Sequence, residues 1–366
     1  GGIDKYVTDA KNNDYSPTAE IKSLFSRSEI PVIRLGEAAS QQVFWKDMIG
    51  EYNTRKEYTL WGITGAVKFG LVEKIKYFQE LNPEVEFIIT LNMNDTAENA
   101  ADLAEFLTGD SNTEWGAKRI EYGINNPVSV KMYQLGNEND YAEPVIDLKE
   151  YNQKSSEIIQ AISEVDEKAM FGAIGGTALY TEYLKNGTYD DTWLKGVVDG
   201  LNNEIDFVTF NWYYDMNSTY EIDALVNLVT NTINESTRND RIKICFTETA
   251  GAIYGNPATV PYNLQGVLAT ADFYIRAYQN TRVTSANYHA INSNSWQYIW
   301  FDENGKSGLT GIGMLHTLLK EYGCGKVLSS DLTGYKHSIE ADVAGVAISP
   351  EENRINLIFI NHKGES

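Results

Sequence analysis

The chain of 366 residues carries a formal net charge of −21 at pH 7, and hydrophobic residues make up 42% of it. This charge repels a phosphate backbone, which argues against nucleic acid as the partner and is compatible with a neutral polymer such as a polysaccharide. The apolar content suffices for a sizeable core, and the absence of any uninterrupted apolar stretch of about 18 residues argues against a membrane span.

Short β-branched runs alternate with longer helical patterns, which predicts βα units and a parallel sheet. The expected strands are Pro31–Leu35, Glu86–Leu91, Val130–Leu135, Met170–Ala173, Ile205–Asn211, Ile242–Thr247 and Val283–His289. The expected helices are Thr96–Leu107, Leu148–Val165, Tyr220–Ile233, Leu264–Tyr278 and Ile312–Tyr322. This order predicts a (β/α)8 TIM barrel, whose eighth strand lies either within Gly1–Asp14 or upstream of this chain.

After Gly325 the pattern changes to alternating β-structure over Lys326–Ile360. The chain stops at Ser366, too early for a complete sandwich of about 100 residues. We therefore expect residues 1–325 to form a catalytic barrel and residues 326–366 to form part of a β-sandwich accessory domain. Of the two cysteines, Cys245 lies in an apolar strand-like run, which predicts a buried free thiol.

Two glutamates directly follow predicted strands, Glu138 in the run LGNEND and Glu248 in the run CFTETA. In a TIM barrel the active site lies at the C-terminal ends of the strands. Glycoside hydrolysis needs two carboxyl groups, and a retaining enzyme places them about 5 Å apart as nucleophile and acid/base. Asn137, just before the first glutamate, is a candidate donor to the 2-hydroxyl of the sugar. These residues predict a retaining glycoside hydrolase.

The segment Asn94–Glu138 resembles the family 51 glycoside hydrolases, the α-L-arabinofuranosidases and some endoglucanases of the (β/α)8 clan A. Those enzymes show a helix EAADLVEY, a stretch W-x-x-x-R-x-x-x-G and the run VKYWEIGNE. Here the chain reads ENAADLAEFLTG, then Trp115, Arg119 and Gly123, then VKMYQLGNE. Residues 34–50 and 69–73 are similar to further segments of that family.

The resemblance implies a role for each matching residue. Glu138 corresponds to the acid/base and Glu248 to the nucleophile of a double displacement. Arg34 would support the nucleophile electrostatically, Tyr213 would donate a hydrogen bond to it, and Trp296 would form part of the sugar platform. The residues themselves leave alternatives: Arg34 also fits a salt bridge inside the barrel, and a shift of one residue in strand register would exchange Tyr213 for Tyr214.

The chain departs from the family pattern near the nucleophile. The family usually has PGG at Gly36-Glu37-Ala38, His-Tyr-Tyr at strand six where Asn211-Trp212-Tyr213-Tyr214 stands, and Trp where Thr249 follows the nucleophile. Two further residues, Trp212 and Asn92, are candidates for substrate contact. Core packing explains Trp212 and Trp296 equally well, and loop capping explains Asn92 equally well.

We therefore expect a retaining enzyme, α-L-arabinofuranosidase-like, that acts on plant or algal polysaccharide or its oligosaccharides. The alternatives are another clan A glycosidase (endo-β-glucanase, β-xylosidase or β-agarase), a non-catalytic carbohydrate-binding barrel, and a metal-dependent hydrolase, for which no His-rich cluster is present. No cofactor, metal, nucleic acid or membrane is expected as a partner. The start of the chain lacks the regions of a signal peptide, and a trimmed signal leaves the same start, so a secreted or a cytoplasmic protein, of bacterial type, fits.

Overall fold

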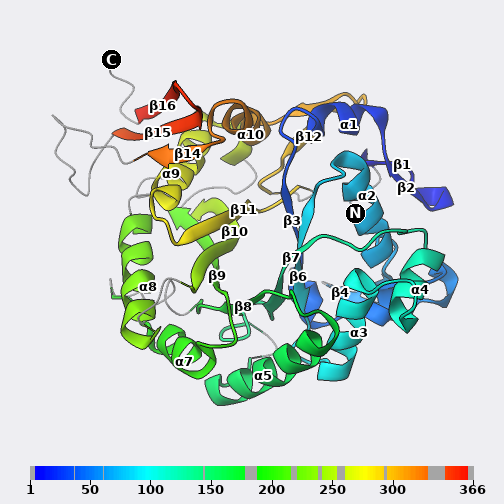
Figure 1. The fold of residues 1–366 in the computed structure, drawn as a ribbon. Coiled ribbons are helices and arrows are strands. Elements are labelled where there is room, and N and C mark those ends of the chain that lie inside the picture. Colours follow the sequence, from blue (N-terminus) through cyan, green and yellow to red (C-terminus); the bar gives the residue numbers. More distant parts are fainter. Residues whose placement is uncertain are drawn as a thin grey trace.

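The computed structural model describes residues 5–36, 38–60, 62–142, 145–177, 188–215, 221–237, 241–253, 260–291, 295–328 and 343–361. Its centre is a seven-stranded parallel sheet in the order β11-β10-β9-β8-β7-β6-β3, which curls into a barrel with helices around its outside (Figure 1). The strands are β3 (Val32–Leu35), β6 (Glu86–Leu91), β7 (Val130–Leu135), β8 (Phe171–Ile174), β9 (Phe207–Asp215), β10 (Lys243–Ile253) and β11 (Val283–Tyr288). The predicted (β/α)8 class and all seven predicted strands are confirmed.

Within the described residues, the helices comprise the five predicted ones and four more. The described helices are α1 (Ala19–Phe25), α2 (Leu71–Leu81), α3 (Ala97–Thr108), α4 (Glu114–Glu121), α5 (Leu148–Val165), α7 (Thr192–Leu201), α8 (Glu221–Thr237), α9 (Leu264–Gln279) and α10 (Gly311–Tyr322). The expected first residue of α8, Tyr220, lies outside the described residues. No helix in the described ranges has the length and apolarity needed to cross a membrane.

The core between strands and helices explains why these segments fold as they do. All four residues of β8 are buried, as expected for a parallel strand covered by helices on its outer face. Helix α5 buries Ile158, Ile159 and Ile162 at helical spacing, and each such side chain contributes about 1.5–3 kcal/mol when removed from water. The Asp147 carboxylate accepts a hydrogen bond from the Glu150 backbone N–H, which fixes the start of this helix.

Between α3 and β7 lie the three residues Trp115, Arg119 and Gly123 that resemble the family motif, and they make packing and backbone contacts. Trp115 meets Trp45 edge-on, with ring centroids 4.9 Å apart. The buried Arg119 guanidinium donates to backbone carbonyls, including that of Gly109 at 2.6 Å, and so satisfies acceptors at the end of α3. Gly123 follows with φ of 80°, a left-handed conformation that favours glycine. These three residues therefore stabilise the connection between α3 and β7.

The two edges of the parallel sheet, β3 and β11, are not paired with each other. The described part of the segment Gly1–Asp14 supplies no strand to this sheet, because β1 (Val7–Asp9) pairs antiparallel with β2 (Asp14–Pro17) in a separate sheet. Residues 1–4 lie outside the described residues. Two other small antiparallel pairs decorate the barrel: β4 (Glu57–Leu60) with β5 (Ile63–Ala66), and β12 (Ile299–Phe301) with β13 (Ser307–Leu309).

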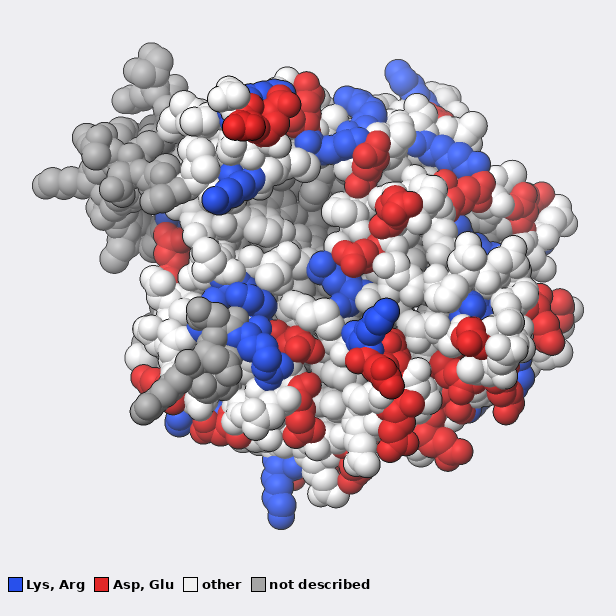
Figure 2. Space-filling view, in the orientation of Figure 1, with Lys and Arg blue, Asp and Glu red and all other residues white. Residues whose placement is uncertain are grey.

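The C-terminal strands form a three-stranded antiparallel sheet, β14 (Lys326–Leu328), β15 (Val343–Glu351) and β16 (Arg354–Asn361). Its inner face, with Val346, Ile348 and Ile360, packs against α9 and α10. This is the partial β-sandwich that the sequence predicts, and the domain boundary at residue 325 stays a prediction. Over the face of the molecule seen in Figure 2, acidic and basic side chains are interspersed.

Candidate active site

Glu248 and its partners come together at the C-terminal end of the parallel strands. The backbone of β10 opposes β9 with Phe246 beside Phe210 and Glu248 beside Asn211, so Thr247 is one extra residue on β10. Such a bulge re-aims the side chains that follow it and is common next to active sites. The Thr247 hydroxyl donates to Asn211 Oδ1 at 3.2 Å, which holds the bulge in place.

Three side chains from three other strands or strand ends surround the Glu248 carboxylate. Arg34 Nη1, on β3, lies 2.8 Å from Oε2. The Tyr213 hydroxyl, on β9, donates to Oε1, and His289 Nδ1, just after β11, lies 3.4 Å from the same oxygen. The ion pair is largely removed from water, because the side chains of Arg34 and Glu248 are only 7% and 11% exposed.

These partners set the charge of Glu248. Burial acts to raise its pKa, but the charges of Arg34 and His289 and the hydrogen bonds from Tyr213 and Arg34 outweigh burial and hold the pKa below its usual range. Burial and the neighbouring Glu248 carboxylate together raise the pKa of Tyr213, which therefore keeps its proton and remains a donor. Glu248 is thus an ionised carboxylate at neutral pH.

Glu138 occupies a different setting, in the loop that follows β7. Its φ is 55°, a left-handed conformation that costs a non-glycine residue about 1–3 kcal/mol and is concentrated at functional sites. The turn needs Gly136, with φ of 85°, because a Cβ there would collide with the Asn139 side chain. Asn139 Oδ1 in turn accepts the backbone N–H of Asn137 at 2.9 Å. The backbone strain therefore serves to aim Glu138.

Asn211 Nδ2 donates a hydrogen bond to Oε1 of the Glu138 carboxyl group at 3.0 Å. Burial raises the pKa of Glu138, the hydrogen bond from Asn211 opposes that rise, and the charge of Glu248 adds to it. The net direction is upward, so Glu138 holds its proton at a higher pH than an ordinary glutamate.

A hydrogen-bonded chain of side chains joins the two glutamates. Arg34 Nη2 donates to Asn137 Oδ1 at 2.5 Å, and Arg34 Nε donates to Gln134 Oε1 at 2.7 Å. Asn137 Oδ1 also accepts from Asn211 Nδ2 at 3.2 Å, and Asn211 binds Glu138. The three nitrogens of the Arg34 guanidinium therefore bind β7, the loop that follows it and β10, which fixes the relative position of the two carboxyl groups.

Aromatic rings flank Glu248. The rings of Tyr213, His289 and Trp296 contact one another, with centroids 5.4 to 6.1 Å apart. Trp296 has φ of 54°, and its Nε1 donates to the Gly251 carbonyl at 2.8 Å. Such a surface suits the C–H face of a sugar ring.

The structure places two predicted residues, Trp212 and Asn92, and the alternative Tyr214 away from this cluster. Trp212 is 2% exposed and belongs to the main core, because alternation along β9 turns it to the side opposite Tyr213. Tyr214 also points outward, where its hydroxyl donates to Thr270 at 2.7 Å. Asn92 Nδ2 donates to the Val43 carbonyl at 3.3 Å, and its Oδ1 accepts from the Asn94 backbone N–H, which are loop-capping contacts.

Three residues at the site were not among the predicted ones: Asn211, His289 and Gln134. A signal for Asn211 existed, because it stands two residues before Tyr213 and so shares its face of the strand. His289 is the last residue of the last predicted strand, and this position was the only signal that it lies at the active-site end of the barrel. Cys245 is buried and forms no disulfide, as expected.

The parallel strands curl into a barrel of the (β/α)8 class, with one glutamate after β7 and another on β10. Comparison with known proteins shows what the chain is similar to. A family model described as Alpha-L-arabinofuranosidase 1 domain matches residues 33–199. An intracellular exo-α-(1→5)-L-arabinofuranosidase from Acetivibrio thermocellus is 22% identical over 210 residues, which is 56% of this chain. The chain spans about 40% of the length of that relative.

Solved structures agree with the sequence matches. A family 51 α-L-arabinofuranosidase from Bifidobacterium longum superposes with a TM-score of 0.81 at 18% identity, covering 99% of this chain and 79% of that chain. The α-L-arabinofuranosidase from Thermotoga maritima, solved as an arabinose complex, superposes with a TM-score of 0.82 at 19% identity, covering 99% and 78%. The predicted resemblance is confirmed: the chain is similar to α-L-arabinofuranosidases, in sequence over part of its length and in fold over almost all of it.

Proposed function

We propose that this protein is a retaining glycoside hydrolase in which Glu248 is the nucleophile and Glu138 is the acid/base. The observation that carries the proposal is the opposite direction of the two pKa shifts within one hydrogen-bonded network. Two carboxyl groups whose environments drive their pKa values apart are the arrangement that assigns an acid and a nucleophile.

The reaction runs in two displacements. First, a Glu248 carboxylate oxygen attacks the anomeric carbon while Glu138 gives its proton to the departing glycosidic oxygen, which yields a glycosyl ester and an alcohol. Glu138 is then a carboxylate and takes a proton from water as the water oxygen attacks the same carbon. The ester bond breaks, and Glu248 and the protonated Glu138 are restored.

The surrounding residues have roles in this scheme that follow from their bonds. Arg34 and Tyr213 keep Glu248 ionised and in place before attack. Asn137 Oδ1 accepts from both Arg34 and Asn211, so the Nδ2 group of Asn137 is the donor available to a sugar hydroxyl. A hydrogen bond at the 2-hydroxyl strengthens in the oxocarbenium-like transition state. Trp296 and Tyr213 offer the ring platform for the sugar.

For the substrate we propose an α-L-arabinofuranosyl linkage of plant or algal polysaccharide or its oligosaccharides. The names of the matched relatives support this choice. Asn211, which contacts Glu138, begins the run Asn211-Trp212-Tyr213-Tyr214 that stands where the family usually has His-Tyr-Tyr. This difference is the reason to test β-glucosidic, β-xylosidic and β-agarosidic substrates beside it.

The experiment is a panel of aryl glycosides and polysaccharides with proton NMR of the first-formed sugar. We expect release from the arabinofuranoside, with the anomeric configuration retained. An inverted first product would contradict the double displacement, and cleavage of another glycoside alone would change the substrate. Binding of oligosaccharides without any release would instead identify a non-catalytic barrel.

A further inference from the structure

The bulge on β10 brings two consecutive side chains to the same side of the strand. Side chains alternate along a regular strand. Cys245 clusters with side chains of β6, β7 and β9 inside the barrel, and Phe246 packs outward against a phenylalanine ring of α9. Alternation alone would turn Thr247 inward and Glu248 outward. Because the pairing with β9 shifts between Phe246 and Glu248, both Thr247 and Glu248 face the site and form hydrogen bonds there.

The buried Thr247 hydroxyl contacts the side-chain amide of Asn211. It lies 3.2 Å from Asn211 Oδ1 and 3.4 Å from the Phe210 carbonyl oxygen. At the other end of the amide, Asn211 Nδ2 lies 3.0 Å from Glu138 Oε1 and 3.2 Å from Asn137 Oδ1. An amide nitrogen carries two hydrogens, and these two acceptors use both of them. The hydroxyl, the amide and the Glu138 carboxyl group therefore form one hydrogen-bonded chain.

Arg34 fixes the direction of every bond in this chain. A guanidinium has donors and no acceptor, so the Asn137 atom that lies 2.5 Å from Arg34 Nη2 is the oxygen. That oxygen needs a donor on its other side, which is Nδ2 of Asn211. Asn211 Oδ1 is then left facing Thr247, whose hydroxyl donates to it. A rotated Asn211 amide would set its oxygen against the oxygens of Asn137 and Glu138, so the amide has one orientation.

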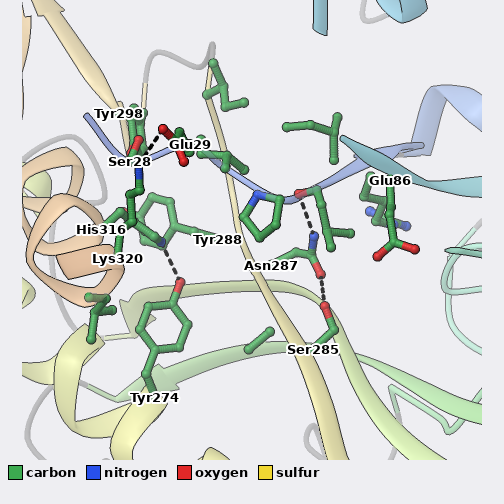
Figure 3. Close-up of a pocket in the computed structure, with 18 of the residues that line it drawn as sticks. Ser28, Glu29, Glu86, Tyr274, Ser285, Asn287, Tyr288, Tyr298, His316 and Lys320 are labelled. Carbon is green, nitrogen blue, oxygen red and sulfur yellow. Dashed lines mark hydrogen bonds and ion pairs between the residues drawn. The ribbon is translucent and has the colours of Figure 1, made fainter. Parts of the chain in front are cut away.

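The next strand of the sheet, β11, contains a similar pair with another target. The Ser285 hydroxyl donates to Asn287 Oδ1 at 2.8 Å, and Asn287 Nδ2 donates to the Val32 carbonyl at 3.4 Å (Figure 3). On β11 the oriented amide therefore binds the backbone of β3, whereas on β9 it binds a carboxyl group of the site. The pair on β11 serves as a matched control for the pair formed by Thr247 and Asn211.

We propose that Thr247 and Asn211 are positioning residues that keep an N–H donor on Glu138 through both displacements; this inference rests on the proposed function. Because Oε1 of Glu138 accepts from Asn211, Oε2 is the oxygen left to carry the acid proton. Once that proton has passed to the leaving group, the same N–H stabilises the carboxylate until it takes a proton from water. An amide does not titrate, so the donor is present throughout the working pH range.

The groups that face Glu138 set the sign of the expected change. They are Arg34 on β3, Tyr213 on β9, Glu248 on β10 and Asp140 in the same loop. Burial and the charges of the two carboxylates raise the pKa of Glu138, whereas the hydrogen bond from Asn211 and the charge of Arg34 lower it. Loss of the Asn211 bond should therefore raise the pKa further. The acid then stays protonated to higher pH, and the basic limb of the kcat/KM profile moves upward.

The test compares Thr247→Val, which lacks the hydroxyl at nearly the same shape, with Thr247→Ser, which keeps it. Carbon-13 NMR of glutamate-labelled protein follows the titration of Glu138, whose signal is assigned by its absence from Glu138→Gln. We expect the midpoint to rise by about 0.5 pH unit in Thr247→Val, and by roughly 1–2 pH units in Asn211→Leu, where the donor itself is lost. Thr247→Ser should titrate like the parent. A parental midpoint in Thr247→Val would overturn the proposal.

Ser285→Ala is the control, because it removes the hydroxyl of the pair on β11. It should leave the Glu138 midpoint unchanged, and an equal rise in Ser285→Ala and Thr247→Val would contradict a specific role for Thr247. The pH profiles of kcat/KM separate this inference from the proposed function. A parent protein that cleaves no glycoside contradicts the hydrolase assignment. An active parent whose basic limb is the same in Thr247→Val contradicts the positioning role alone.

Discussion

The two glutamates of the site are held by very different parts of the molecule. Glu248 lies on a long buried strand, beyond a bulge, with Arg34, Tyr213 and His289 around its carboxylate. Glu138 lies in a tight loop in a left-handed conformation, and Asn211 is the hydrogen-bond donor at its carboxyl group. Position at a strand end brings each carboxyl group to the site, whereas the balance of burial against the neighbouring charges and hydrogen-bond donors sets its pKa.

The largest loss of turnover is expected when the charge of Glu248 is removed. Glu248→Gln lacks a nucleophile, so turnover of an activated and of an unactivated substrate should both fall by roughly four to six orders of magnitude. Steady-state kinetics measures this loss. Glu164→Gln on the exposed surface of α5 is the matched control and should turn over like the parent protein. Near-parental turnover by Glu248→Gln would remove the residue from the nucleophile role.

The loss at Glu138 should depend on the leaving group. Glu138→Gln cannot donate a proton, and removal of general acid–base catalysis costs about 10²–10⁴ in rate. A leaving group that departs without protonation, such as a dinitrophenolate, should show a smaller loss in the first displacement than an alkyl alcohol. Pre-steady-state kinetics with both leaving groups measures the difference. Equal losses would show that Glu138 is not the acid.

A smaller loss of turnover should distinguish two adjacent tyrosines of β9, Tyr213 and Tyr214. Tyr213→Phe removes one donor to the Glu248 carboxylate, and a hydrogen bond to a charged group contributes about 1.5–3 kcal/mol, or roughly 10- to 150-fold in turnover. Tyr214→Phe removes a hydroxyl that donates to Thr270 in the core. It should leave turnover nearly unchanged and affect thermal unfolding instead. Equal turnover by the two variants would contradict the assigned register.

The smallest expected effect is on stability, and it has opposite signs at the two glutamates. The raised pKa of Glu138 means that the unfolded chain ionises first, so stability falls as pH rises above the unfolded pKa. Glu138→Gln removes this penalty and should raise the melting temperature by about 1–3 °C at pH 7, a gain that disappears at pH 4.

Glu248 behaves in the reverse way. Its lowered pKa contributes stability above the unfolded pKa, and this contribution is lost as pH falls through the folded pKa. Glu248→Gln should therefore lower the melting temperature at pH 7, because Arg34 then stays buried opposite a neutral partner. Calorimetry at pH 7 and pH 4 measures both variants. A shift of the same sign for both would contradict the different environments of the two carboxyl groups.

The sequence was informative where local pattern and strand order decide the structure. Alternation of β-branched runs with helical stripes located every strand of the parallel sheet, and the strand ends located both glutamates. Helices α2 and α7 were not predicted, although α7 buries Leu194, Val197, Val198 and Leu201 at helical spacing. The chemistry that distinguishes the glutamates depends on contacts between distant parts of the chain, such as Arg34 with Glu248, which no local pattern contains.

Strand register determines which of the remaining candidate residues face the site. Trp212, Tyr213 and Tyr214 are consecutive, and a shift of one residue exchanges the side facing the site with the side facing the helices. The pairing of β9 with β10, including the extra residue Thr247, places Tyr213 toward Glu248 and the other two in the core. That pairing is a property of two strands together, and the sequence of one strand does not contain it.

The buried Arg34 guanidinium also has a consequence for folding during synthesis. During synthesis Arg34 leaves the ribosome 214 residues before Glu248, and 103 residues before Asn137. A chain that ends before β10 has a guanidinium in its interior with no carboxylate opposite it, which costs several kcal/mol unless water reaches the charge. We therefore expect β3 to remain accessible to water until β10 has been synthesised. The ion pair between Arg34 and Glu248 then fixes β3 in the barrel.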